Sequence, residues 1–228
     1  MAATTLPLIR STIGKKAIMA VTGLIGYAFV IVHMVGNLKA FTGAEHFDAY
    51  AEFLRTVGEP VFPARTLLWV MRIVLLVAVV LHIWMAVSLS KQDLEARPVR
   101  YRQSKKVQAS FASLTLRWGG IAIFLFLIYH LLHFTFGVPA VHPTFVRGAA
   151  YANMVAAFQN PLVVAVYVLA VAALGMHLYH GVWSMFQSLG LNGARTNGLW
   201  RGLAVISAAG LFLGFAVVPV AVLTGILR

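Results

Sequence analysis

Histidines are the residues of this chain whose type and spacing could do chemistry. The sequence contains eight histidines and no cysteine. Without cysteine the chain cannot ligate iron–sulfur clusters through thiolates, build Cys-ligated zinc sites, form disulfides or attach a c-type haem. A metal bound by this chain must therefore rest on histidine, methionine or carboxylate side chains.

Most of the histidines fall inside long apolar segments. Six do so, namely His33, His82, His130, His133, His177 and His180, while His46 and His142 fall in connecting segments. A titratable ring in hydrocarbon is costly and normally faces the bundle interior, where a partner holds it. A single such histidine would be interpreted as an interhelical hydrogen bond. Histidines in four successive segments indicate a functional site instead.

The depths of four histidines sort them into two pairs. His33, His82, His130 and His177 lie 16, 17, 19 and 16 residues from the start of their segments, a depth of about 24 to 28 Å at 1.5 Å per residue. Successive segments cross in opposite directions. His33 should therefore meet His130 near one membrane face, and His82 should meet His177 near the other.

Two histidines at one depth on facing helices, without cysteine, suit the two axial positions of a b-type haem iron. Two such pairs predict two haems, roughly 15 to 20 Å apart along the membrane normal. The motifs YHLLH and HLYH each carry a second histidine three residues on, so His133 or His180 could replace His130 or His177 as ligand. The earlier member of each motif is preferred.

Two arginines lie about two turns inside their segments. Arg117 is expected near the same face as His82 and His177, and Arg72 near the face of His33 and His130. Each could pair with a haem propionate. The alternative, about equally favoured by the sequence alone, is that each side chain extends to the lipid headgroups.

The elements that must position these residues are five membrane-spanning helices. A span needs roughly 20 mostly apolar residues, and the chain offers stretches at about 17–39, 65–90, 111–137, 161–190 and 203–227. No separate soluble domain fits between them, so residues 1–228 are expected to form one transmembrane domain. The first stretch has spanning length and no small-residue cleavage site follows it, which argues against a removable signal peptide.

Composition supports an all-α integral membrane protein. The chain is 61% hydrophobic and only 11% charged, which leaves too little polar surface for the nucleic-acid partner that a net charge of +12 would otherwise suggest. With a cytoplasmic N-terminus, twelve of the eighteen basic residues fall on inner segments, including the loop from Lys91 to Lys106. The positive-inside rule favours this orientation. The basic loop is interpreted as topology, with docking of an acidic or nucleotide-handling partner as the second hypothesis.

Three stretches carry a family resemblance. They are KKAIMAVTGLIGYAFVIVHMVGNLKAF, IYHLLHFTFG and NMVAAFQNPLVVAVYVLAVAALGMHLYHGVWSMFQSLGLN. Together they strongly resemble the five-helix, two-haem cytochrome b anchor of bacterial succinate dehydrogenases and quinol:fumarate reductases, from about residue 11 to residue 193. In that family four histidines on helices I to IV bind two haems, I with III and II with IV. The resemblance transfers the ligand roles to His33, His82, His130 and His177, and a propionate role to Arg117.

The resemblance implies a multi-pass protein of the bacterial inner membrane with two soluble partners on the cytoplasmic face, a succinate-oxidising flavoprotein and an iron–sulfur subunit. Electrons would pass from the clusters through the inner and outer haems to quinone, usually menaquinone in the two-haem type. No succinate site is expected in this chain. The quinone site stays open among several polar residues near the span ends: His133, His180, Tyr27, Ser184, Lys15 and Ser11. Helix V contains no acid, so a proton path through a transmembrane glutamate, proposed for some relatives, is not expected.

Two other hypotheses fit parts of the pattern. One is the cytochrome b of another quinone-linked enzyme, such as a hydrogenase or formate dehydrogenase, which also uses histidines from several helices. The other is a haem-free anchor or transporter whose histidines relay protons or pack helices. Haem content separates the last hypothesis from the first two, and the identity of the co-purifying partner separates those two from each other.

Overall fold

Long helices make up most of the molecule. The computed structural model describes residues 10–96 and 111–228, with side chains from residue 116 onward in the second range. Within these residues the regular secondary structure is entirely helical. Five helices are long and apolar enough to cross a bilayer: α1 Thr12–Leu38, α3 Thr66–Glu95, α4 Phe111–His130 with its extension η2 Leu131–Phe136, α6 Pro161–Ser188 and α7 Asn197–Leu223. The predicted all-α chain with five membrane-spanning helices is confirmed at this level.

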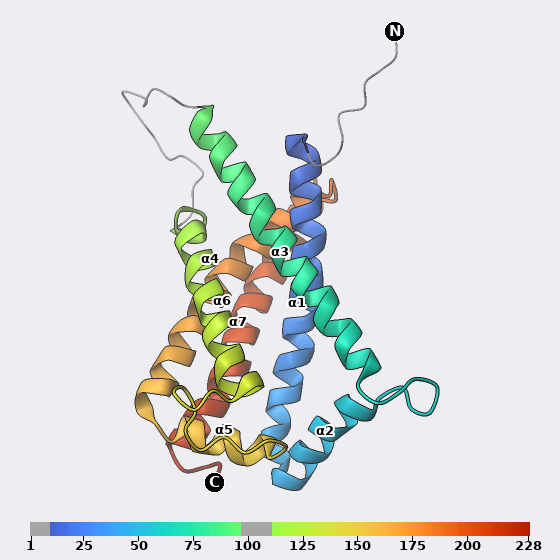
Figure 1. Ribbon diagram of the computed structural model, residues 1–228. Helices are drawn as coiled ribbons and strands as arrows, with labels where there is room; N and C mark the ends of the chain where they lie inside the picture. The colour runs from blue at the N-terminus through green and yellow to red at the C-terminus, as the bar shows by residue number, and fades with distance from the viewer. Residues whose placement is uncertain (1–9, 97–110) are drawn as a thin grey trace.

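The five helices alternate in direction and give the molecule two ends (Figure 1). We call the end where α1, α4 and α7 begin the N-terminal face, and the opposite end the C-terminal face. The exterior between them is apolar, with side chains such as Leu76 64% exposed, and Leu169 and Ile206 each 71% exposed. Exposed apolar side chains on helices of this length are what a lipid environment requires.

Local signals set the helix ends, which differ from the predicted spans by several residues. α1 begins five residues early because the Ser11 side chain accepts a hydrogen bond from the Gly14 backbone N–H at 3.0 Å. α6 begins as predicted, with Asn160 as N-cap and Pro161 in the first turn. α7 begins at Asn197, six residues before the predicted span, because its first turns carry polar residues that a hydropathy pattern excludes.

The predicted third span is helical throughout its described residues, but the helix type changes along it. It is α-helical to His130 and then π-helical over Leu131–Phe136. It ends at Gly137, whose φ of 60° is left-handed. A Cβ on Gly137 would also collide with the Phe145 ring, so this turn requires glycine.

Two short helices that the sequence did not predict lie on the C-terminal face. They are α2 Ala44–Thr56, preceded by the 3-10 turn η1 Lys39–Thr42, and α5 Ala150–Phe158 (Figure 1). Asp48 Oδ1 accepts a hydrogen bond from the Tyr151 backbone N–H at 2.9 Å and so joins α2 to α5. Both helices are too short to cross a bilayer, which is why a search for spans passes over them.

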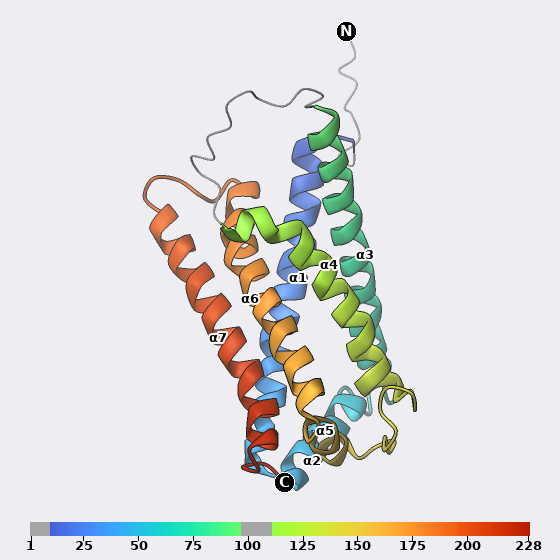
Figure 2. The same cartoon turned by 90° about the vertical axis from the view of Figure 1, so that its left-hand side faces the viewer.

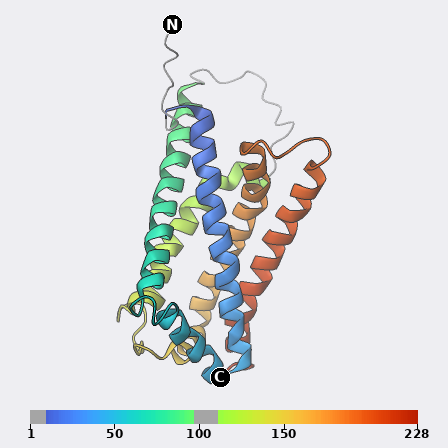
Figure 3. The ribbon, with the colours of Figure 1, turned by 90° about the vertical axis from the view of Figure 1, so that its right-hand side faces the viewer.

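Helix packing divides the bundle unevenly. α6 and α7 pack together most extensively, followed by α1 with α3 and α4 with α6, and α1 also contacts α6 and α7 (Figures 2 and 3). Where Gly175 of α6 faces α7, an added Cβ would lie 3.3 Å from the Ala208 carbonyl oxygen. Among the described residues, α1 and α4 are at most weakly packed on each other, and so are α3 and α6.

Candidate functional site

The first histidine pair joins α1 to α4 in the C-terminal half of the bundle. The ring centres of His33 and His130 are 5.8 Å apart with the ring planes at 78°. Aromatic rings surround the pair, with Phe29 stacked on His33 at 5.3 Å and Phe126 tilted against His130 at 5.9 Å. The surrounding rings hold both imidazoles in an apolar setting.

The second pair joins α3 to α6 in the N-terminal half. The ring centres of His82 and His177 are 6.2 Å apart with the planes at 59°. The His82 ring lies close to the backbone of α1, because a Cβ on Gly23 would be only 3.3 Å from His82 Cε1. Glycine at position 23 therefore gives the imidazole its room.

The two pairs lie at different depths. His82 Nδ1 contacts the Met19 carbonyl oxygen at 3.1 Å, and Met19 is fourteen residues from His33 on α1, about 21 Å along the helix. On α6, Tyr167 contacts His130 and lies ten residues from His177, about 15 Å. The two pairs are therefore about 15 to 21 Å apart along the helices, while the predicted separation of two haems stays a prediction.

Each pair connects two helices whose backbones do not pack closely. α1 and α4 meet through the rings of His33 and His130, and α3 and α6 meet through those of His82 and His177, while the tighter contacts of all four helices are with other neighbours. Two imidazoles that bind one metal ion from opposite sides have ring centres roughly 6 to 6.5 Å apart, since each metal–nitrogen bond is about 2 Å. Both observed distances are close to this spacing.

Packing between aromatic rings alone produces similar ring distances. The hydrogen bonds of the ring nitrogens therefore say more about metal binding than the distances do. A carbonyl oxygen only accepts, so His82 Nδ1 carries the proton in its bond to Met19, and the Nε2 lone pair is free to bind a metal. His177 Nδ1 is buried and has no hydrogen-bond partner among the described residues. Gln92 Oε1, His142 Nε2 and Asn192 Oδ1 are buried and unpartnered in the same way, and metal binding through Nε2 would leave His177 Nδ1 as it is, so this atom does not by itself mark a ligand site.

The alternative ligands His133 and His180 lie elsewhere. His133 is 1% exposed, and its ring centre is 4.8 Å from that of His142. His180 lies beside Trp183 at 6.3 Å. In the described part of the chain, no ring contact joins His133 to His33 or His180 to His82. The geometry pairs the earlier histidine of each motif.

One tyrosine connects two of the histidines. The Tyr167 hydroxyl lies 3.3 Å from His130 Nδ1 and 2.9 Å from His133 Nδ1. A hydroxyl donates one hydrogen bond and accepts others. If His130 binds a metal through Nε2, its Nδ1–H donates to Tyr167 and the Tyr167 hydroxyl donates to His133. Tyr167 is buried, at 7% exposed, so these contacts lie inside the bundle.

The two arginines are not placed beside the histidines by any described contact. Arg117 Nη2 lies 3.8 Å from Asp93 Oδ2 in an exposed ion pair at the N-terminal face. The Arg72 guanidinium lies 4.9 Å from the centre of the Trp69 ring, and both side chains are exposed. Both interpretations of the two arginines, as propionate partners or as side chains that extend to the headgroups, stay predictions. Among the residues that the structure describes, the buried cation is instead Lys15, which is 8% exposed.

Sequence reasoning missed Tyr167, Met19 and Thr22. Thr22 Oγ1 lies 3.3 Å from His82 Nδ1. Tyr167 precedes His177 by ten residues on α6, outside any local motif, and only the packing of α4 on α6 brings it to His130. The contact from Met19 uses a backbone carbonyl, a group that every residue has.

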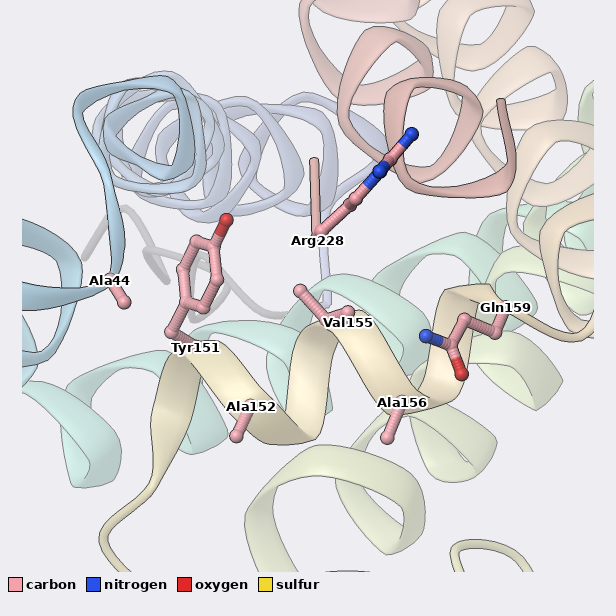
Figure 4. Close-up of a pocket in the computed structure, with 7 residues that line it drawn as sticks. All are labelled: Ala44, Tyr151, Ala152, Val155, Ala156, Gln159 and Arg228. Atoms are coloured by element: carbon pink, nitrogen blue, oxygen red, sulfur yellow. The ribbon is translucent and has the colours of Figure 1, made fainter. Parts of the chain in front are cut away.

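Two cavities have linings that do not include the paired histidines. An apolar groove of about 590 Å³ lies between α1 and α3, over residues 14–25 and 73–81, and includes Thr22. A second cavity of about 410 Å³ lies at the C-terminal face between α5 and the last residue, where Tyr151 and Gln159 accompany Arg228 (Figure 4). Neither cavity is lined by a histidine.

Comparison with protein-family models, with curated proteins and with solved structures finds no match to this chain. The described residues also contain no group of three or more His, Cys, Asp or Glu side chains that could hold a metal ion by themselves. A metal at either pair would need its remaining ligands from elsewhere. A haem macrocycle would provide them, because a haem iron takes only axial ligands from a protein.

Proposed function

We propose that this chain is the di-haem cytochrome b anchor of a bacterial succinate:quinone oxidoreductase, with its N-terminal face in the cytoplasm. One observation carries the proposal. Two pairs of imidazoles, His33 with His130 and His82 with His177, lie at two depths in one bundle of membrane-spanning helices. The sequence resemblance supplies the choice of enzyme. The absence of cysteine means that iron–sulfur clusters must belong to a partner.

The residues present fit two haems. Each pair supplies two imidazoles at a spacing near that of opposed metal ligands. The Met19 carbonyl contacts His82 Nδ1 and the Tyr167 hydroxyl contacts His130 Nδ1, and an acceptor at this nitrogen orients a histidine that binds metal through the other one. Bound at these pairs, haem would supply one-electron chemistry.

The protein's own part is to orient imidazoles and to exclude water. Rings such as Phe29, Phe126 and Phe215 enclose the first pair, and an apolar shell of this kind controls solvent access to a metal. The flavoprotein and iron–sulfur subunits would dock on the N-terminal face, and menaquinone is the proposed acceptor. Basic residues on this face support the orientation. Arg97, Arg100, Arg102, Lys105 and Lys106 belong to this prediction but lie outside the described residues.

The proposal is tested by alanine substitution of one pair at a time in the full chain, purified with its partners. His82→Ala or His177→Ala should remove one of two haems and leave the other, and so should His33→Ala or His130→Ala, measured by pyridine haemochrome assay. His46→Ala is the matched control, because His46 is exposed on α2, and it should retain both haems.

Loss of both haems in every pair variant, or loss of neither, would contradict the pairing. A wild-type protein without haem would remove the proposal and leave the haem-free anchor or transporter. If the chain binds haem but co-purifies with hydrogenase or formate dehydrogenase subunits and shows no succinate oxidation, it is a cytochrome b of that other enzyme.

A further inference from the structure

A buried lysine lies between α1 and α3 on the N-terminal side of the second histidine pair. Lys15 is 8% exposed, and its Nζ donates a hydrogen bond to Ser88 Oγ at 2.7 Å. The ion pairs of the described residues are Arg55 with Glu52 and Arg117 with Asp93, so no described carboxylate neutralises Lys15. Burying a cation without an anion is costly.

The helix register places Lys15 close to the second pair. Lys15 is four residues, about 6 Å, from Met19, whose carbonyl oxygen contacts His82. Ser88 is six residues, about 9 Å, beyond His82 on α3. Lys15 and Ser88 therefore lie within one to two helical turns of the His82 ring, on its N-terminal side.

The two side chains present several unused donors. An ammonium group has three N–H donors, of which Ser88 takes one, and the Ser88 hydroxyl keeps its own proton to donate. A group that accepts from both residues and neutralises the cation would be an anionic oxygen, and such charge-assisted bonds are the stronger ones. Carboxylate and phosphate share this chemistry.

We propose that Lys15, with Ser88, is the carboxylate-binding site that anchors a propionate of the haem held by His82 and His177. This inference rests on the proposed function and names a cation different from Arg117, which is exposed and already paired with Asp93. Haem carries its carboxylates at one edge of the macrocycle, and that edge turns toward a membrane face because charge avoids hydrocarbon. Lys15 lies on that side of the pair.

The chain offers a closely matched control. Lys16 follows Lys15 directly, carries the same charge and is exposed. Lys15→Met removes the buried cation at nearly constant side-chain length, while Lys16→Met removes the same charge from the surface. Lys15→Arg restores a cation at the buried position. The haem at His33 and His130 reports in every variant whether the chain has folded.

The experiment measures retention of each haem in the purified full chain, first with native haem and then after exchange for the haem dimethyl ester, which lacks free carboxylates. With native haem, Lys15→Met should weaken retention of the haem at His82 and His177 by roughly tenfold or more. Lys15→Arg should recover most of the loss, and Lys16→Met should match wild type. With the dimethyl ester, wild type and Lys15→Met should retain this haem equally.

Three results would overturn the inference. The first is equal retention of native haem by Lys15→Met and Lys16→Met. The second is a Lys15→Met defect that persists with the dimethyl ester, which would assign Lys15 to helix packing or to a lipid phosphate. The third is no recovery in Lys15→Arg. Absence of both haems from wild type would instead contradict the proposed function, so the two failures are distinguishable.

Discussion

At the scale of single residues, the site depends on which nitrogen of each imidazole forms a hydrogen bond within the protein. The Met19 carbonyl fixes the proton on His82 Nδ1, and the Tyr167 hydroxyl lies within reach of His130 Nδ1. Both contacts leave Nε2 for a metal. The two contacts differ in how they can be tested. A substitution can remove the Tyr167 hydroxyl, but it cannot remove the Met19 backbone carbonyl.

Tyr167→Phe removes that phenol. A hydrogen bond from Nδ1–H makes an imidazole a more basic ligand, so its loss should raise the midpoint potential of the haem at His33 and His130. The expected shift is about 20 to 60 mV, since a hydrogen bond of about 1 kcal/mol corresponds to roughly 43 mV for one electron. Redox titration of the purified protein measures both potentials.

Tyr129→Phe is the control for this substitution, because the Tyr129 ring packs at 6.0 Å from that of Tyr167 and no described hydrogen bond joins its hydroxyl to a histidine. The potential of the haem at His82 and His177 should stay unchanged in both variants. A fall in potential on Tyr167→Phe, or an equal shift at both haems, would refute the role given to Tyr167.

At the scale of elements, hydropathy predicted the spans and helical rise predicted which histidines share a depth. Hydropathy did not predict α2 and α5, since helices of 13 and 9 residues produce no spanning signal. It also gave no sign that the chain becomes π-helical after α4, in η2, the segment in which His133 lies beside His142. The propionate role of Arg72 and Arg117 stays a prediction, because depth does not determine which way a long side chain extends.

Glycines within the bundle have unequal roles. At Gly175 an added Cβ would be 3.3 Å from the Ala208 carbonyl, a backbone atom that cannot rotate away, whereas at Gly181 on the same helix it would meet nothing within 4 Å. Gly175→Ala should therefore lower the melting temperature of the detergent-solubilised protein, at a cost of about 1 kcal/mol or more. Gly181→Ala should leave it equal or slightly raised.

Fluorescence-detected thermal melts of the two variants in one detergent give the comparison. Equal melting temperatures would show that α6 and α7 do not approach as closely at Gly175 as the structure describes.

At the scale of the whole molecule, the two faces differ in charge and in structure. The C-terminal face carries α2 and α5, and its acids Glu45, Asp48, Glu52 and Glu59 nearly balance its basic residues, whereas basic residues outnumber Asp93 and Glu95 at the described N-terminal face. The proposed orientation places the N-terminal face in the cytoplasm. It would then be the face that meets soluble redox partners.

Because the chain has no cysteine, single cysteines can report the orientation directly. Lys91→Cys lies near the end of α3 at the N-terminal face, and His46→Cys lies on α2 at the C-terminal face; both positions are exposed. In intact cells a membrane-impermeant maleimide that passes the outer layers should label His46→Cys and should label Lys91→Cys only after the inner membrane is broken. The reverse pattern would invert the topology.

The central claim is that this bundle holds two haems, each between two histidines. The most direct measurement is the haem-to-protein ratio of the purified wild-type protein, taken together with its absorption and electron paramagnetic resonance spectra. The account predicts two b-type haems per chain, both low-spin, as six-coordinate bis-histidine iron requires. One haem or none per chain, or a high-spin spectrum from either haem, would contradict it.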